Sequence, residues 1–143
     1  MPMIDIYATT GTFQNIHQLA MDAAAVVKSV EGVPDLALFR KNTAAFVHEM
    51  PKGVLSNIDG DTDYVRIQVT TNIGALTPRE KQLAVVRRLT ELAARAAGDP
   101  TLLDRTWVIL AEAIEGGWGL KGHAYTNAEL VGAARAEIDK LKG

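Results

Sequence analysis

The sequence contains no cysteine, which excludes a disulfide framework, thiolate metal sites and a cysteine nucleophile. No apolar run approaches the roughly 20 residues that a membrane-spanning helix requires. Neither sign of charge dominates, since 15 Lys and Arg stand against 17 Asp and Glu, which argues against a nucleic-acid partner. The start of the chain has no basic stretch before an apolar one, so no signal peptide is predicted. We expect a cytoplasmic protein without a membrane partner.

The first sixty residues read as strand, helix and strand. Residues 3–10 alternate, with Ile4 and Ile6 on one face, as in a half-buried strand. Apolar residues then recur at three- and four-residue spacing over 13–30, which predicts an amphipathic helix with Thr12 as its N-cap. Residues 43–50 form the next predicted strand.

The second half repeats this order. Residues 64–71 read as a strand, Thr77 and the following proline open a second helix with Thr77 as N-cap, and 106–113 read as another strand. A shift of 63 residues places Ile4 on Ile67. We interpret this pattern as an internal duplication of a β-α-β unit.

One domain is therefore expected over residues 1–143, with one repeat at about 2–60, the other at about 63–122 and a helical tail at 126–143. Each strand–helix–strand unit implies a parallel strand pair with a right-handed crossover. The predicted fold class is α+β, a four-stranded sheet with two helices on one face plus the C-terminal helix. The other face of the sheet then needs a cover, and another subunit is the expected one.

Pro2 is the first candidate for chemistry. One interpretation is a spacer residue. The other depends on removal of Met1, which a small second residue permits, so that Pro2 carries a free secondary amine. An α-amino group titrates near ~8, and burial among apolar residues lowers its pKa. A neutral amine near the working pH is a competent general base.

These features together resemble the tautomerase superfamily. The resemblance rests on Met-Pro directly before a strand, on the duplicated unit, and on residues 112–122, which read EAIEGGWGLKG. The 4-oxalocrotonate tautomerases (4-OT) have a similar Glu-x-x-x-Gly-x-aromatic-Gly-x-x-Gly hairpin, and the fused length is similar to that of the cis-3-chloroacrylic acid dehalogenase group. Residues 63–75 also resemble 5-carboxymethyl-2-hydroxymuconate isomerase. The resemblance covers about residues 2–122.

The resemblance implies roles for a few residues. Pro2 matches the catalytic proline, and Trp118 matches an aromatic that lines the pocket, although Trp118 also reads as an interface side chain. The arginines that bind substrate carboxylates in 4-OT have no counterpart at the matching positions. Dehalogenase-like relatives carry arginines in the loop where this chain has Asn72, a candidate substrate-binding residue. Their helix histidine, aromatic partner and water-activating acid also lack counterparts, so a dehalogenase or hydratase is disfavoured. By strand placement, three arginines are the nearest candidates for a donor to the substrate anion: Arg66, Arg105 and Arg40. Each of them also reads as a solvated charge at a strand end.

The function that the resemblance implies is a cofactor-independent isomerase, a keto–enol tautomerase acting on a small enolisable or unsaturated carbonyl acid. The alternatives are a diverged member, either a decarboxylase or a hydratase, and a catalytically silent oligomeric module. Short relatives with one unit form hexamers, so a homotrimer is expected. No cofactor and no metal are expected, because the three histidines lack metal-ligand spacing and the acidic run 59–63 lacks the rest of a calcium loop.

Overall fold

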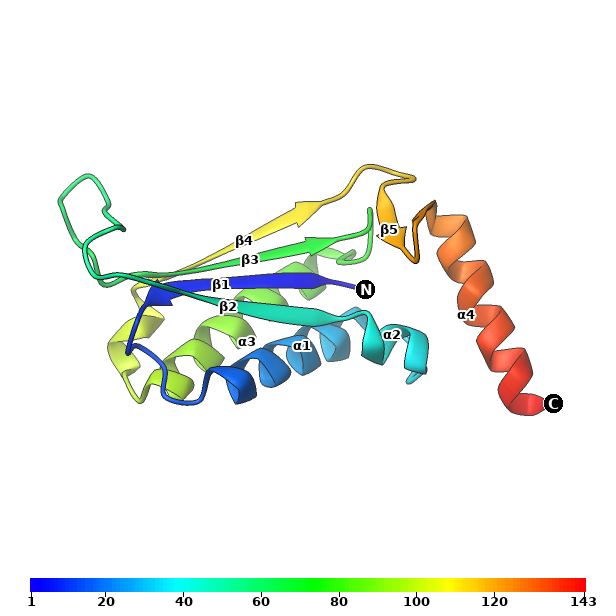
Figure 1. The fold of residues 1–143 in the computed structure, drawn as a ribbon, viewed down its shortest axis with the longest axis horizontal. Coiled ribbons are helices and arrows are strands. Elements are labelled where there is room, and N and C mark those ends of the chain that lie inside the picture. The colour runs from blue at the N-terminus through cyan, green and yellow to red at the C-terminus, as the bar shows by residue number, and fades with distance from the viewer.

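The computed structural model describes residues 1–143. A mixed sheet has the strand order β2-β1-β3-β4 (Figure 1) and comprises β1 (Met3–Thr9), β2 (Ala44–Met50), β3 (Val65–Thr71) and β4 (Thr106–Glu112). The helices are α1 (Ile16–Glu31), α2 (Ala37–Lys41), α3 (Arg79–Ala97), the short 3-10 helix η1 (Pro100–Leu103) and α4 (Asn127–Lys142). A two-stranded hairpin of β5 (Trp118–Leu120) and β6 (His123–Tyr125) precedes α4. None of the helices combines the length and apolarity needed to span a membrane.

The strands pair as two parallel units placed back to back. β1 pairs in parallel with β2 across α1, and β3 pairs in parallel with β4 across α3. β1 and β3 meet antiparallel at the centre of the sheet, with Met3 opposite Thr70. The predicted fold class is thus confirmed. Because β1 and β3 run in opposite directions, the N-terminal end of β1 lies beside the loop that follows β3.

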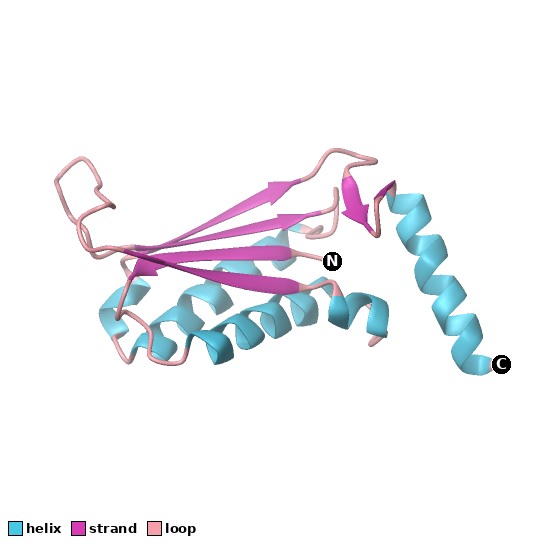
Figure 2. Cartoon of the chain, in the orientation of Figure 1, coloured by secondary structure: helices cyan, strands magenta, loops and turns pink.

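The helices α1 and α3 cover one face of the sheet and leave the other uncovered by helix (Figure 2). Ile4, Ile6, Ile67 and Val69 point to the covered face, and each is at most 1% exposed. The prediction that Ile4 and Ile6 share the buried face of β1 is therefore confirmed. The helical residues of the same core cluster are Leu19, Ala23 and Val27 of α1 and Val85, Leu89, Leu92, Ala93 and Ala94 of α3.

Both predicted threonine N-caps are wrong. The cap of α1 is Asn15, whose side chain accepts a hydrogen bond from a first-turn amide at 3.0 Å. The hydroxyl of Thr12 instead donates to the carbonyl three residues earlier, at 2.7 Å. Thr77 does the same with Gly74 at 2.7 Å, and Pro78 occupies the cap position of α3. In both cases the threonine hydroxyl donates to a backbone carbonyl of the turn before the helix, so it does not accept a hydrogen bond from the amides of the first helical turn.

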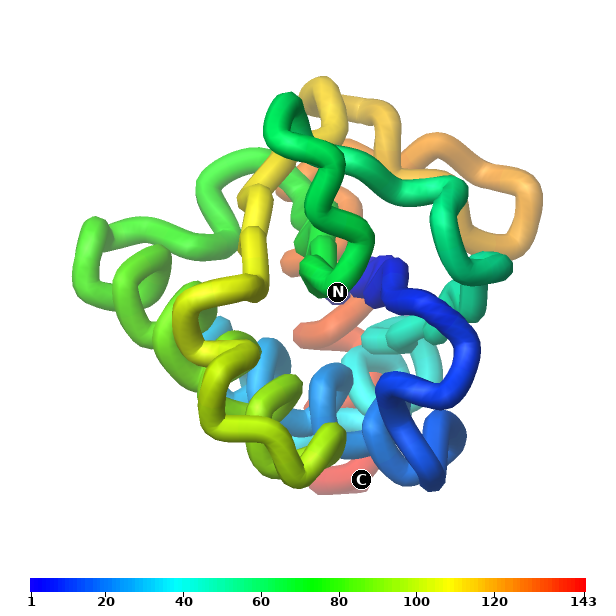
Figure 3. Tube along the Cα trace, turned by 90° about the vertical axis from the view of Figure 1, so that its left-hand side faces the viewer, coloured from blue at the N-terminus to red at the C-terminus, as the bar shows by residue number.

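The C-terminal tail is helical, as predicted, and it lies at the N-terminal end of β1. Figure 3 views the molecule from the end that carries the loop between β2 and β3, and α4 (red) lies at the back. Leu130 of α4 joins a second apolar cluster with Met1, Phe39 and Trp118. The carboxylate of Glu137 accepts hydrogen bonds at 2.9 and 3.1 Å from the first backbone amides of α2, which fixes α4 to α2.

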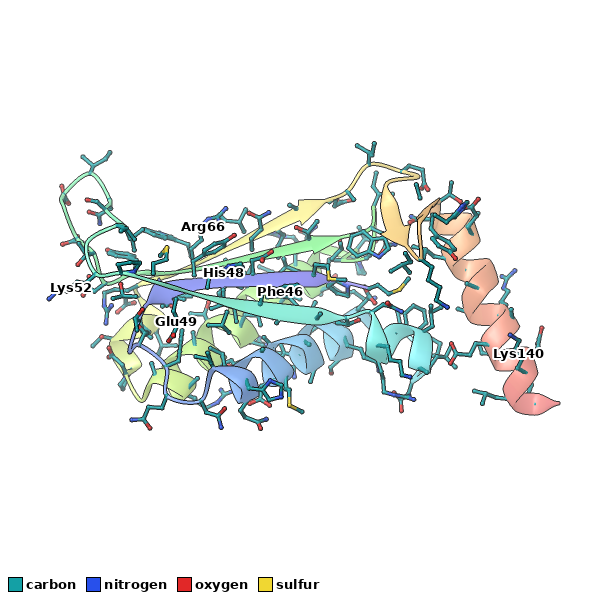
Figure 4. The ribbon with its side chains drawn as sticks, in the orientation of Figure 1. Phe46, His48, Glu49, Lys52, Arg66 and Lys140 are labelled. Atoms are coloured by element: carbon teal, nitrogen blue, oxygen red, sulfur yellow. The ribbon has the colours of Figure 1, made fainter.

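The uncovered face of the sheet carries aromatic and polar side chains. Phe46, His48 and Arg66 project from the side opposite the helices (Figure 4). His48 forms a 2.7 Å contact with Asp5 and stacks on Tyr7 with ring centroids 4.4 Å apart. Phe46, on the edge strand β2, is 52% exposed, so this face presents a large apolar side chain to solvent.

Candidate active site

The N-terminal amine of the chain is buried. Met1 is 2% exposed, and its amine lies 3.2 and 3.4 Å from the two carboxylate oxygens of Glu31. The chain reaches the interior because β1 sits in the middle of the sheet, where the Pro2 carbonyl accepts a hydrogen bond from the Ala44 amide at 3.2 Å. Pro2 itself is fully buried.

The electrostatics of this amine are set by two opposing effects. Burial lowers the pKa of the Met1 amine below its ordinary value, because the charged form loses solvation. The Glu31 carboxylate acts in the opposite direction, through its charge and its hydrogen bonds, but its effect is the smaller one. An amine at this place is therefore neutral over a wider pH range than an exposed terminus.

Glu31 is held by the end of α1. It is the last residue of that helix, and Gly32 ends the helix in the left-handed conformation at φ 77°. The Lys81 ammonium on α3 donates to the Glu31 backbone carbonyl at 2.8 Å. The Glu31 side chain is 4% exposed, so its carboxylate is directed inward.

A cavity of about 470 Å³ opens beside the Met1 amine. It lies between the end of α1, the loop after β3, α2 and α4, at the end of the sheet where the N-terminus is marked (Figure 1). Most of its lining is apolar. The lining residues that carry polar or charged side chains are Glu31, Asn72, Asn127 and Arg135.

The two asparagines of the cavity are hydrogen-bonded, whereas its arginine has no ion-pair partner. The Asn72 amide donates to the side-chain oxygen of Asn127 at 3.0 Å, and Asn127 donates to the Ile73 carbonyl at 2.8 Å. Arg135 is the one basic residue of the lining, it is exposed, and it forms no ion pair. Arg135 is therefore a free cation at the wall of the cavity.

Trp118 lies in the same apolar cluster as Met1, Phe39 and Leu130. It is 7% exposed, and its indole N–H is buried without a hydrogen-bond acceptor. An unsatisfied buried donor is unfavourable by about 1–3 kcal/mol. The structure thus places the predicted aromatic beside the N-terminus, with an unused donor.

Of the three arginines suggested by strand placement, Arg40 lies on α2 and pairs with Asp35 at 2.9 Å, and the other two lie at the opposite end of the sheet. Arg66 is opposite Tyr7, at the far end of β1, where it donates to Gln68 at 2.7 Å. Arg105 precedes β4 at that same far end and pairs with Asp99 at 2.8 Å. The pKa of Asp99 is lowered, first by hydrogen bonds from Thr101 and then by Arg105.

Of the predicted site residues, the structure therefore brings Pro2, Trp118 and Asn72 to one end of the sheet and leaves Arg66 and Arg105 at the other. Sequence reasoning missed Glu31 and Arg135. Glu31 reads as an ordinary polar residue at a helix end, and Arg135 as one solvated charge on a tail helix. Gly32 indicated in the sequence where α1 ends, but nothing in the sequence indicated that the Glu31 side chain points toward the N-terminus.

Comparison with solved structures shows the same fold. A protein crystallised after inactivation by 2-oxo-3-pentynoate has a TM-score of 0.69 and 19% identity, covering 90% of this chain and 98% of the other. A member of the cis-3-chloroacrylic acid dehalogenase family has a TM-score of 0.72 and 13% identity, covering 98% of each chain.

A fused 4-OT whose solved structure is an asymmetric trimer has a TM-score of 0.69 and 16% identity, covering 90% of this chain and 98% of the other. No family model and no curated protein match the sequence. The resemblance to the tautomerase superfamily is confirmed at the level of the fold, which this chain shares over nearly its whole length.

Proposed function

We propose that this protein is a cofactor-independent tautomerase in which Pro2, freed by removal of Met1, is the general base. The observation that carries the proposal is the buried amine at the start of β1, which lies beside a mainly apolar cavity. Only three covalent bonds separate the Pro2 nitrogen from the Met1 nitrogen, so the two lie within about 4 Å of each other. A secondary amine at Pro2 therefore occupies nearly the same environment.

Removal of Met1 has two chemical consequences. It converts the Pro2 nitrogen from a non-basic amide into a basic amine, and burial favours the neutral form of that amine. It also vacates the space that the Met1 side chain fills among Phe39, Trp118 and Leu130. The neutral amine then takes a proton from an enolisable acid and returns it to the neighbouring position of the conjugated system.

The cavity favours a small acid with one carboxylate. Its volume of about 470 Å³ suits a compact substrate, and its lining is largely apolar. We assign the substrate carboxylate to Arg135, the one cation in the lining, with Asn72 as a neutral donor nearby. Trp118 supplies apolar surface and an unused N–H at the same end. We do not extend the assignment to Arg66 and Arg105, which lie at the opposite end of the sheet.

A direct assay tests this proposal. Intact mass of the purified protein establishes whether Met1 is absent, and the processed protein is then given phenylenolpyruvate and a dicarboxylic 2-hydroxydienoate as paired substrates. We expect ketonisation of the monocarboxylate with a rate that rises as the amine deprotonates, and at least tenfold weaker kcat/KM for the dicarboxylate. A processed protein that converts neither acid would favour the silent oligomeric module.

The oligomer is part of the proposal. Ile109 is 48% exposed and Phe46 is 52% exposed on the uncovered face of the sheet, and a fused 4-OT with this fold is a trimer in its solved structure. We expect light scattering at micromolar concentration to give three times the 15.4 kDa mass of one chain. Ile109→Asp should shift the mass toward that of one chain, because an unpaired charge would be buried in the interface. The matched change at fully exposed Ile58 should leave the mass unaltered, and a monomeric native protein would contradict the expectation.

A further inference from the structure

We infer that Glu31 is a positioning residue for the proposed reaction, in which its carboxylate is the counter-ion of the ammonium that Pro2 forms on taking a proton. The inference rests on the proposed function of Pro2. Its basis is the ion pair already present, in which the Met1 amine lies 3.2 Å from a Glu31 oxygen while both groups are almost fully buried. The site therefore already contains a carboxylate directed at an N-terminal cation.

The Glu31 carboxylate has no other partner. Its two oxygens are hydrogen-bonded to the Met1 amine, and no other donor reaches them. A buried carboxylate is strongly unfavourable unless a cation faces it. When Met1 is removed, the Pro2 amine is the nearest group able to carry that positive charge, since its nitrogen lies within about 4 Å of the Met1 nitrogen.

The other charged groups around Glu31 form no hydrogen bond or ion pair with its carboxylate. Lys81 on α3 donates to the Glu31 backbone carbonyl rather than to the carboxylate. Lys28, one turn earlier on α1, lies 3.4 Å from Asp35. Arg135 on α4 lines the same cavity without a bond to Glu31. None of these replaces the terminal amine as the carboxylate's partner.

In the proposed reaction the proton moves only between the substrate and the Pro2 amine. The neutral Pro2 amine accepts the proton of the enol O–H bond, whose electron pair forms the carbonyl. The resulting ammonium lies close to Glu31, which stabilises it, because an opposite charge within about 4–6 Å favours the charged form. The ammonium returns the same proton to the carbon, the C–H bond forms from the former double bond, and the amine is neutral again. No external reactant is needed.

Glu31→Gln tests the inference in the processed protein. Removing the carboxylate takes away the effect that raises the amine pKa, so the pKa falls further. Because the neutral amine is the active form, the rising limb of the pH–rate profile should move to lower pH by about one unit. The maximal rate should fall roughly tenfold, since a weaker base with an unpaired ammonium results. Glu31→Asp keeps a carboxylate, so its pH–rate limb and its maximal rate should both lie between those of the parent protein and those of Glu31→Gln.

Two further measurements separate this role from a structural one. Titration of the Pro2 amine by nitrogen-15 NMR should show a lower midpoint in Glu31→Gln, independently of any activity. Glu91→Gln is the matched control, because it makes the same chemical change at an exposed glutamate of α3, and it should leave both the pH profile and the NMR midpoint unchanged. If Glu31→Gln does not fold, Glu31→Asp carries the same two measurements.

The outcomes distinguish the two proposals. An unchanged limb and midpoint in Glu31→Gln, in a protein that loses its activity on substitution of Pro2, overturns the inference about Glu31 alone. A shifted midpoint with a full maximal rate also overturns it, since stabilisation of the ammonium would then contribute nothing to turnover. Full activity without Pro2 overturns the proposed function itself.

Discussion

Pro2→Ala is expected to lower kcat/KM for phenylenolpyruvate by roughly 10²–10⁴-fold, the range that a positioned general base contributes. Alanine at this place still permits removal of Met1, so a terminal amine remains. That amine is primary and is no longer held by the pyrrolidine ring, so both its basicity and its orientation change. The measurement is the steady-state rate of ketonisation across pH, with intact mass confirming that each variant begins at residue 2.

The control for Pro2→Ala is stability. Pro2 is fully buried, and only its carbonyl is hydrogen-bonded in the sheet, to the Ala44 amide at 3.2 Å. Alanine keeps that carbonyl, so the midpoint of denaturant unfolding should change little while the rate collapses. Unchanged turnover in the variant would remove Pro2 from the mechanism.

Ile67→Ala is expected to lower the free energy of unfolding by about 2–5 kcal/mol, the cost of deleting a large aliphatic side chain from a packed core. Ile67 is 1% exposed on the central strand β3, where it lies opposite Ile6 and beside Val108. This loss is a large share of the roughly 5–15 kcal/mol that stabilises an ordinary domain. Urea unfolding at fixed protomer concentration measures it, because subunit association makes stability depend on concentration.

Ile58→Ala is the matched control for the core substitution. Ile58 lies in the loop between β2 and β3 and is fully exposed, so the same atoms are deleted without leaving a cavity. Its unfolding free energy should stay within about 0.5 kcal/mol of the parent protein. Equal losses in the two variants would contradict the assignment of Ile67 to the core.

The sequence by itself determined the four sheet strands, the three long helices and their order, but not the short helices α2 and η1. The alternation at Ile4 and Ile6, the helical spacing that follows, and the return of the same pattern near Ile67 fix which segments are strands and which faces are buried. These are properties of neighbouring residues, because a strand repeats every two residues and a helix every 3.6. Pro2 was also recognisable from the sequence, since its chemistry depends on its own ring and on its place at the start of a strand.

The tertiary structure alone decided what surrounds Pro2. Glu31 reaches the terminal amine only because the end of α1 is packed beside the start of β1, and Arg135 reaches the cavity only because Glu137 fixes α4 to α2. Arg66 and Arg105 lie far from the amine because the antiparallel register of β1 and β3 places them at the other end. These contacts join residues up to about a hundred positions apart, and periodicity carries no information on how such distant segments are packed together.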